Sequence, residues 1–390
     1  MEVMPGYKQT EVGVIPEDWE VVSIGNAGQV LGGRQRSPHN VGEPCKYLRV
    51  ANVFDGFLET EDVLEMPFTT AEKERFLLRH GDILLNEGQS IDLVGRSAIY
   101  RGIPDQCCFQ NTLIRFRANR NTCVEFAQLV FQQYLRLGVF ASIALQTTSI
   151  AHLGSGRFAV LKMPLPPLPE QKAIAKVLGN ADALIETLEQ LIAKKRILKQ
   201  GAMQKLLTGK KRLPGFIKEW ETRYLADVAP LQRGFDLPNS KLQQGPYPVV
   251  YSNGVLNHHA AFQVKGPGIV TGRSGTIGTV TFVEQDFWPH NTSLWVTTFK
   301  DNDPKFIFYL YARIGLERFA TGTGVPTLNR NDVHSFKVRI PPTKAEQEAI
   351  AAILSTMDAE IALLEAQLAK YRQLKQGLMQ KLLTGRIRLV

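Results

Sequence analysis

Hydrophobic residues recur at alternating spacings of three and four along two long stretches of the chain, residues 170–208 and 346–384. This spacing predicts two long amphipathic α-helices that can pair through a heptad seam. The apolar stripe of the first stretch, broken only by Lys195, consists of Ile174, Val177, Ala181, Leu184, Leu188, Leu191, Leu198 and Ala202. The stripe of the second consists of Ile350, Ile353, Met357, Leu364, Tyr371, Leu374 and Leu378, and is widened by Ile361 and Leu368.

Both helices have recognisable ends. Prolines precede each one, as PLPPLP at 164–169 and as Pro341 and Pro342, while Gly209 and Gly385 follow. A proline entry and a glycine exit are typical of helix termini. Each helix then spans about 39 residues, or roughly 58 Å, which is too long to stand without a partner for its stripe. We expect an antiparallel pair whose interface is formed by Leu184, Leu188, Leu191, Leu198, Leu364, Tyr371, Leu374 and Leu378.

These two stretches are copies of one module. Residues 170–213 and 346–389 align without gaps at an offset of 176, with 27 of 44 positions identical. The preceding regions correspond only faintly: Trp19 in IPEDWEVVSIG resembles Trp220 in FIKEWETRYLADV, and both regions contain an Asn-Thr pair, at Asn111 and Asn291. The chain therefore alternates variable and shared segments.

The variable regions predict two small α/β modules. In the first, strand-like runs such as 46–53, 81–88 and 111–118 precede a helix-like run at 124–138. The second repeats this order with runs at 247–253, 268–283 and 291–299 before 305–320. We therefore expect an α+β fold with two small α/β domains joined by two long antiparallel, coiled-coil-like helices. The predicted domains are 1–168, 169–213, 214–342 and 343–390.

Composition narrows the class of protein. The 390 residues are 44% hydrophobic and 21% charged, with a formal net charge of +9, which fits a folded chain with an anionic partner. No run of 18 apolar residues and no signal-peptide pattern occur, so we expect a cytoplasmic protein that does not bind membranes. The cysteines, Cys45, Cys107, Cys108 and Cys123, lack metal-ligand spacing, and we expect free thiols and no metal site. Lys and Arg gather in the C-terminal halves of both helices, where they form either a solvated face or a surface for DNA phosphate or a partner subunit.

The arrangement resembles the specificity subunits of type I restriction-modification systems. The resemblance rests on the duplicated helices, the Pro-Pro entry before EQ, the LKQG-x-MQKLLTG exit, and the GRSGTIG and FQNTLIRF runs. It implies that each variable module is a target-recognition domain reading one half of a bipartite DNA site, and that the helices set the spacer. It also implies two modification (methyltransferase) subunits docked on the helices, and restriction-translocase subunits. S-adenosylmethionine, ATP and Mg would then belong to those partners, with no cofactor and no catalytic residue in this chain.

Candidate DNA-contacting residues lie in polar, turn-rich loops of the two modules. Arg suits guanine, Asn and Gln suit adenine, and cations or small hydroxyls suit phosphate. The candidates in the first module are Arg34, Gln35, Arg36, Ser37, Gln89, Arg96 and Gln110; those in the second are Arg233, Lys241, Asn253, Arg273, Ser274, Asn329 and Arg330. We interpret Asn111 and Asn291, which lie within apolar runs, as structural hydrogen-bonding residues.

Two other functions account for less of the sequence than DNA reading does. An adenine methyltransferase should carry an Asn/Asp-Pro-Pro-aromatic tetrad, but the proline pairs here read LPPL and IPPT. A nucleotide-binding G-x-x-x-x-G-K-[ST] loop does not occur, and His258 and His259 lack companion carboxylates. A helical scaffold or adaptor without sequence-specific reading explains the helices but leaves the two divergent modules without a role.

Overall fold

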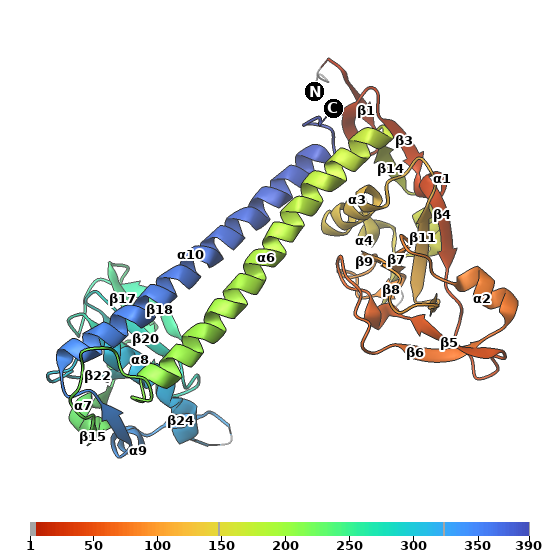
Figure 1. Cartoon of the computed structure of the whole chain (residues 1–390). Coiled ribbons are helices and arrows are strands. Elements are labelled where there is room, and N and C mark those ends of the chain that lie inside the picture. The colour runs from red at the N-terminus through yellow and green to blue at the C-terminus, as the bar shows by residue number, and fades with distance from the viewer. Residues whose placement is uncertain (1–4, 147–148, 323, 390) are drawn as a thin grey trace. The chain divides into compact units, whose positions relative to one another are not determined.

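The computed structural model describes residues 5–146, 149–322 and 324–389 and forms two compact units (Figure 1). Unit 1 comprises Met1–Thr187 and Ala369–Val390, and unit 2 comprises Leu188–Leu368. Each unit contains one of the predicted modules and one half of each long helix. The predicted boundaries instead made each long helix a domain of its own, at 169–213 and 343–390, whereas the two units divide each helix between them. Within the described residues, no helix combines the length and the apolar character required to cross a membrane.

Unit 1 is built on a four-stranded antiparallel sheet. Its strands, in order, are β4 (Gly28–Gly32), β11 (Leu113–Ala118), β7 (Ile83–Asn86) and β9 (Ser97–Ile99). A three-stranded sheet follows the order β10 (Cys108–Phe109), β5 (Glu43–Leu48) and β6 (Leu64–Phe68). Smaller pairings join β12 (Leu145–Gln146), β13 (Ala151–His152) and β8 (Gly88–Gln89); β14 (Lys162–Leu165) and β3 (Glu20–Ser23); and β1 (Tyr7–Thr10) and β2 (Gly13–Pro16).

The helices of unit 1 cover this sheet and join it to the long helices. They are α1 (Ile24–Ala27), η1 (Val50–Asn52), α2 (Thr70–Phe76), α3 (Val124–Arg136), α4 (Val139–Ile143) and α5 (Ser155–Val160). One face of α3 is apolar, and its Phe131 meets Phe116 of β11 edge-on with ring centroids 5.2 Å apart. The same hydrophobic core includes Ile174 and Met379 from the long helices. Burial of these apolar faces therefore fixes the module to its half of each long helix.

Unit 2 repeats this architecture. Its four-stranded antiparallel sheet follows the order β16 (Leu231–Arg233), β22 (Ser293–Val296), β19 (Gly268–Gly272) and β20 (Val280–Val283). Its three-stranded sheet follows the order β18 (Gly254–His259), β17 (Tyr247–Tyr251) and β21 (Trp288–Pro289). The remaining pairs are β15 (Glu221–Tyr224) with β25 (Lys337–Ile340), and β23 (Ala320–Thr321) with β24 (Thr327–Leu328). The helices are α7 (Leu225–Val228), η2 (Asn239–Lys241), α8 (Pro304–Ile314), η3 (Leu316–Phe319) and α9 (Arg330–His334).

Equivalent strands pair in the same way in both units. The four-stranded order β4-β11-β7-β9 matches β16-β22-β19-β20. The three-stranded order β10-β5-β6 matches β21-β17-β18, and each three-stranded sheet contains one parallel pair, β10 with β5 and β21 with β17. The duplication seen in the sequence of the helices therefore extends to the modules. Their sequences can diverge because the pattern of buried positions and backbone hydrogen bonds is sufficient to specify the sheets.

Both long helices have the predicted length. Helix α6 (Leu168–Leu206) and helix α10 (Lys344–Leu382) contain 39 residues each. Gly209 and Gly385 follow them with φ of +70° and +67°, a left-handed conformation that favours glycine. The proline entries and glycine exits read from the sequence are confirmed.

Within each unit the two helices run antiparallel. In unit 2, Lys199 of α6 pairs with Asp358 of α10, whereas Lys195, one turn earlier on α6, pairs with Glu360 at 2.6 Å. In unit 1, the start of α6 shares a core with the end of α10, where Leu178 and Leu382 belong to the same cluster. The predicted antiparallel pairing is therefore present in both units.

The buried seam differs from the predicted stripe at every second position. Leu188 is buried, and Leu364 and Leu378 are half-buried. Five of the predicted interface residues are instead 37–53% exposed and do not form the buried seam: Leu184, Leu191, Leu198, Tyr371 and Leu374. At four positions the buried residue is the next one along the chain, Leu178, Ile192, Leu354 or Met379, whereas Ile361 and Leu368 are buried as predicted.

Polar seam residues explain the error. Lys199 and Lys375 occupy seam positions, and each reaches an Asp of the facing helix, Asp358 and Asp182 respectively. A lysine can bury its aliphatic stem while its ammonium group ion-pairs at the edge of the interface. Because lysines interrupt the seam, hydrophobic periodicity favours the neighbouring row of apolar residues, which includes Leu184, Leu191 and Leu198, although that row lies outside the seam.

Candidate nucleic-acid interface

Four short segments, made of loops and strand ends, meet at one end of each four-stranded sheet. We call this region the loop edge. In unit 1 it consists of residues 33–35, 86–89, 110–112 and 151–153, and in unit 2 of residues 234–236, 272–275, 290–292 and 326–328. Most of the predicted DNA-contacting residues lie in these segments or next to them.

The same backbone hydrogen bonds hold both loop edges. The N–H of Glu87 donates to Thr112 at 2.9 Å, and the N–H of Arg273 donates to Thr292 at 2.9 Å. Four further bonds recur with donor–acceptor distances of 2.8–3.1 Å. In unit 1 the N–H groups of Leu153, Gln110, Gly33 and Arg34 donate to the carbonyl groups of Glu87, Leu48, Leu113 and Phe109, respectively. In unit 2 the N–H groups of Leu328, His290, Gly234 and Phe235 donate to those of Arg273, Val250, Ser293 and Pro289. The two units thus share one edge framework, residue for residue.

A close backbone approach in this framework requires glycine. A Cβ on Gly33 would lie 2.1 Å from the carbonyl oxygen of Gln110, and a Cβ on Gly234 would lie 2.2 Å from that of His290. These distances leave no room for a side chain. The chain therefore uses glycine at the same place in both edges to bring the first and third segments together.

Different side chains occupy the shared framework. In unit 1, Nδ1 of His152 lies 3.1 Å from Oε2 of Glu87, and Asn111 is exposed. In unit 2, the Arg233 guanidinium donates to Asp236 at 2.8 Å, and the amide of Asn291 donates to the same carboxylate. The hydrogen bond from Asn291 and the charge of Arg233 hold the pKa of Asp236 below its ordinary value, while burial lowers the pKa of His290. Asp236 is therefore anionic and His290 neutral near pH 7.

Arg34, the first candidate along the chain, is committed to contacts inside the protein. Its Nε donates to Glu72 at 2.7 Å and its Nη1 to the carbonyl of Pro67 at 2.6 Å, and its guanidinium lies 4.9 Å from the centroid of the Phe68 ring. The hydrogen bond from Arg34 holds the pKa of Glu72 below its usual range. We therefore leave Arg34 out of the proposed DNA-contacting set.

The other candidates in unit 1 are more accessible. Gln35 and Arg36 are exposed, and the hydroxyl of Ser37 accepts a hydrogen bond from the N–H of His39. Gln89 and Gln110 are half-buried at the loop edge. Arg96 is half-buried with its guanidinium 5.4 Å from the centroid of the Phe54 ring.

In unit 2, Arg273 and Ser274 lie on the loop edge, and Asn253 is exposed in the turn between β17 and β18. Asn329 accepts the N–H of Asn331 as the N-cap of α9, where Arg330 is exposed. Lys241 is exposed in η2, outside the loop edge.

Sequence reasoning missed the acidic and histidine side chains of this edge. Glu87 and His152 lie outside the prediction, because cations and amides are the side chains that suit phosphates and purine edges. Asn111 was interpreted as a structural residue, whereas its side chain is exposed; Asn291 is structural in the sense expected.

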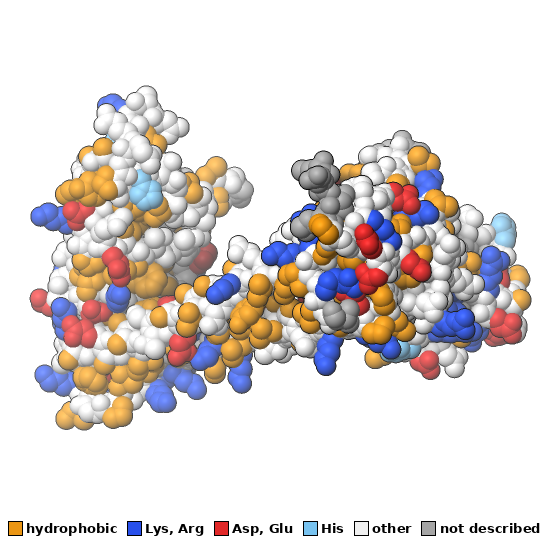
Figure 2. Space-filling model, turned by 90° about the horizontal axis from the view of Figure 1, so that it is seen from above, with side chains coloured by type: hydrophobic (Ala, Val, Ile, Leu, Met, Phe, Trp, Pro, Cys, Tyr) orange, Lys and Arg blue, Asp and Glu red, His pale blue; other side chains and the backbone are white. Residues whose placement is uncertain are grey.

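On the face shown in Figure 2, Lys and Arg are interspersed with Asp and Glu rather than gathered in one basic patch. Within the described ranges, no three His, Cys, Asp or Glu side chains are grouped to hold a metal ion.

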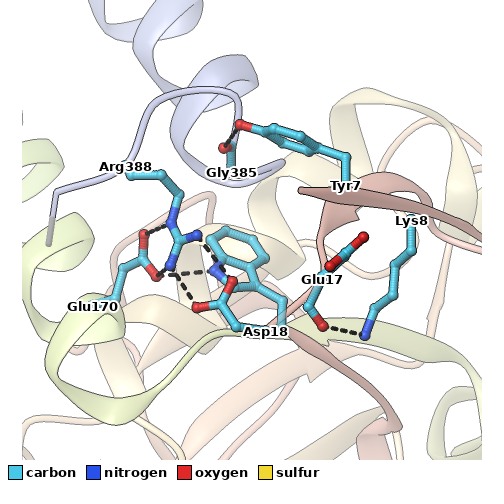
Figure 3. A network of polar contacts seen from close by, with 8 residues as sticks. Tyr7, Lys8, Glu17, Asp18, Glu170, Gly385 and Arg388 are labelled. Atoms are coloured by element: carbon cyan, nitrogen blue, oxygen red, sulfur yellow. Dashed lines mark hydrogen bonds and ion pairs between the residues drawn. The ribbon is translucent and has the colours of Figure 1, made fainter. Parts of the chain in front are cut away.

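A buried glutamate joins each module to the long helices. In unit 1, Glu170 accepts hydrogen bonds from Nε1 of Trp19 at 2.9 Å and from Nε of Arg388 at 2.7 Å, and Arg388 also pairs with Asp18 (Figure 3). Tyr7 donates to the carbonyl of Gly385 in the same network (Figure 3). This network, the Glu170 clamp, links the N-terminal module to the start of α6 and the end of α10.

Unit 2 contains the same clamp with the helix ends exchanged. Glu346, at the start of α10, accepts from Nε1 of Trp220 at 3.1 Å and from Nε of Arg212 at 2.7 Å, beyond the end of α6. The adjacent glutamines, Gln171 and Gln347, are also buried and bind backbone groups of their own module. The EQ motifs, together with the arginines that follow the LLTG exits, therefore position the modules on the helices.

Two related modules with one edge framework and different edge side chains define a protein with two separate binding edges. The family described as "Type I restriction modification DNA specificity domain" matches residues 16–194 and 217–371. The chain belongs to this family, and the resemblance seen in the sequence is confirmed.

Relatives cover almost the whole chain. It is 27% identical to the type I restriction enzyme MjaX specificity subunit of Methanocaldococcus jannaschii, over 98% of this chain and 96% of that protein. It is 25% identical to the MjaVIII specificity subunit of the same organism, over 96% and 94%. The fold is similar to that of a type I restriction-modification S subunit from M. genitalium, with a TM-score of 0.63, 15% identity and 98% of both chains covered. A chain from a structure of type I R-M complex assembly gives a TM-score of 0.59 at 16% identity, over 96% and 99%.

Proposed function

We propose that this chain is the DNA-specificity subunit of a type I restriction-modification complex, in which each module reads one half of a bipartite target. The observation that carries this proposal is the repeated loop edge: one backbone framework presents different polar side chains in the two units. Such an arrangement suits two readers that dock on DNA alike and recognise different bases. We infer that the chain itself does no catalysis.

The long helices would form an antiparallel coiled coil that sets the unread spacer and docks the modification subunits. The five exposed residues, Leu184, Leu191, Leu198, Tyr371 and Leu374, support the docking role, because an apolar row on a helix that already has a buried seam favours a protein partner. Two methyltransferase subunits, with S-adenosylmethionine, and restriction-translocase subunits, with ATP and Mg, would complete the assembly. Lys195 and Arg196 are ion-paired with Glu360 and Glu365, so other cations in the C-terminal halves of the helices would meet DNA phosphate or a partner subunit.

The test is to co-express the chain with its modification subunits and to sequence the methylated adenines. We expect a bipartite motif that disappears when this chain is omitted. Exchange of residues 17–163 for those of a relative should alter one half of the motif and leave the other intact. A complex that forms without any bipartite motif would favour the helical scaffold instead, and methylation by the chain alone would reveal an active site within it.

DNA binding should also weaken steeply with salt, because each phosphate neutralised by a cation releases counterions. Binding of the purified complex to a duplex that carries the motif, measured between about 50 and 200 mM salt, should lose several orders of magnitude in affinity if six or more phosphates are contacted. A flat response would contradict phosphate contacts.

A further inference from the structure

Glu87 and Arg273 occupy the same position of the shared edge framework and carry opposite charges. We propose that this position reads one base pair in each half-site, with the Glu87 carboxylate accepting a hydrogen bond from a cytosine amino group and the Arg273 guanidinium donating to a guanine. This inference rests on the proposed function and names two residues that determine specificity. A carboxylate suits the N4 amino group of cytosine, and an arginine fork suits O6 and N7 of guanine.

The equivalence of the two residues follows from their backbone contacts. Each follows the third strand of its sheet, β7 or β19, directly. Each N–H donates to the carbonyl of a threonine, Thr112 or Thr292, at 2.9 Å. Each carbonyl accepts the N–H of a buried leucine, Leu153 or Leu328, at 2.8 Å. The side chains therefore leave the framework at the same point.

The Glu87 carboxylate is held ready to accept a hydrogen bond. The side chain is 22% exposed, and its Oε2 is fixed by Nδ1 of His152 at 3.1 Å. Oε1 accepts no hydrogen bond from the residues that the structure describes. An oriented, partly exposed acceptor, one of whose oxygens makes no hydrogen bond among the described residues, matches a single amino group on a base edge.

The Arg273 guanidinium likewise keeps donors available. Nη1 donates to the carbonyl of Asn291 at 3.4 Å, a long bond that orients the side chain. Nη2 and Nε make no hydrogen bond among the described residues. A planar fork with two such donors can form the paired hydrogen bonds by which arginine recognises guanine.

A purely structural role does not account for the opposite charges of Glu87 and Arg273 at equivalent positions. The segment that carries His152 is attached through the N–H of Leu153, and its counterpart in unit 2 is attached through the N–H of Leu328. Thr327 occupies the place of His152 in unit 2, so the segment is held there without an ion pair. Because backbone bonds hold the edge in both units, the side chain at this position is free to vary with the base it meets.

An acid at this edge also opposes non-specific DNA binding. Phosphates repel a carboxylate, so Glu87 weakens the contribution that binds every sequence equally. Its location on the loop edge is understandable when a specific donor on a base compensates for the repulsion.

The experiment compares the unmodified complex with Glu87→Gln, Arg273→Lys and the control Glu65→Gln, each assembled with the modification subunits. Glu65 is exposed on β6 of the same unit as Glu87. Glutamine keeps the shape of glutamate, and lysine keeps the charge of arginine but loses the fork. Methylation rates are measured on duplexes that carry each base pair in turn at each position of the motif.

We expect Glu87→Gln to lower discrimination about 10- to 100-fold at one base pair of the half-site read by the first module, with the other half unchanged. Arg273→Lys should do the same at one G·C pair of the other half, and Glu65→Gln should leave both halves intact. The thermal unfolding midpoint of each complex is compared with that of the unmodified one. If Glu87→Gln lowers it, Arg273→Lys carries the test alone.

Two results would overturn the inference: discrimination that is unchanged at every position in both variants, or a uniform loss of rate on all sequences. Either would leave the proposed function standing, because the unmodified complex would still methylate a bipartite motif. Failure of the proposed function would appear differently, as the absence of any such motif in the unmodified complex.

Discussion

Removal of Arg388 tests whether the Glu170 clamp holds the N-terminal module to the long helices. The substitution Arg388→Met keeps an unbranched side chain but deletes both hydrogen bonds to Glu170, which are 2.7 and 2.9 Å long. Glu170 has no exposed surface, so its carboxylate would keep only the bond from Nε1 of Trp19. A buried charge that loses its partner is strongly destabilising, because its desolvation is no longer compensated by an opposite charge.

The expected loss follows from the exposure of the two partners. Breaking a fully buried ion pair costs about 3–5 kcal/mol. The Arg388 side chain is 29% exposed, so water can enter its place, and we expect a loss of about 2–3 kcal/mol. Glu170→Gln removes the charge that needs the arginine. The double variant should therefore be more stable than the sum of the single losses predicts, by at least about 1 kcal/mol.

Asp18→Asn provides the matched control, because Asp18 pairs with the same guanidinium from the surface. Its side chain is 53% exposed, and such pairs contribute at most about 1 kcal/mol. The hydrogen bond from Arg388 holds the pKa of Asp18 below its ordinary value. A depressed carboxyl pKa stabilises the fold above the pKa of the unfolded state, near 4, and this stability is lost as the pH falls. Asp18→Asn should remove that part of the acid dependence.

The assay must resolve the two units, because unfolding of a two-unit chain need not be two-state. Hydrogen exchange followed by mass spectrometry reports opening separately for peptides of unit 1 around Trp19 and of unit 2 around Trp220. Arg388→Met should speed exchange in unit 1 before unit 2, and Arg212→Met should do the reverse. Equal effects on both units, or losses in Arg388→Met and Glu170→Gln that simply add in the double variant, would refute the reasoning.

Two further predictions concern the helices and a buried thiol. Ile192→Ala should cost about 2–4 kcal/mol, because Ile192 is buried in the seam, whereas Leu191→Ala should cost under about 1 kcal/mol; equal losses in denaturant titrations would restore the predicted stripe. Burial raises the pKa of Cys107 to about 12, so its thiol should label slowly at pH 8 until denaturant is added. Because this pKa lies above that of an unfolded cysteine, near 8.5, the stability that it contributes is complete below pH 8.5 and falls as the pH rises toward 12; labelling as fast in the native protein as in denaturant would contradict this burial.

The helices show how far sequence patterns reach. Length, direction and ends could be predicted, because prolines, glycines and periodicity act within a few residues. The seam could not be predicted. Two apolar rows run along α6, one through Leu191 and one through Ile192, and both satisfy the spacing of three and four. Only the facing helix, whose Asp358 receives Lys199 of α6, decides between them.

The candidate interface shows a different limit. Polar, glycine-rich loops predicted several segments of the loop edge, such as 33–35, 86–89 and 272–275, because turns and exposed loops have a local signature. They did not predict which side chains remain available. Arg34 is occupied by Glu72, which lies 38 residues away in the sequence, and no local feature indicates that pair. The acidic Glu87 was overlooked because net charge directs attention to cations.

The shared framework separates folding from recognition in this chain. Backbone hydrogen bonds and the close approaches at Gly33 and Gly234 hold the loop edges, and these contacts do not depend on the side chains that the edges present. Position 87 and its equivalent, 273, can therefore carry opposite charges without any change in fold. The same separation explains why the buried clamps at Glu170 and Glu346 are repeated almost unchanged while the edges differ. The clamps must hold one geometry in both units, whereas under the proposed function each edge must match only its own half of the DNA target.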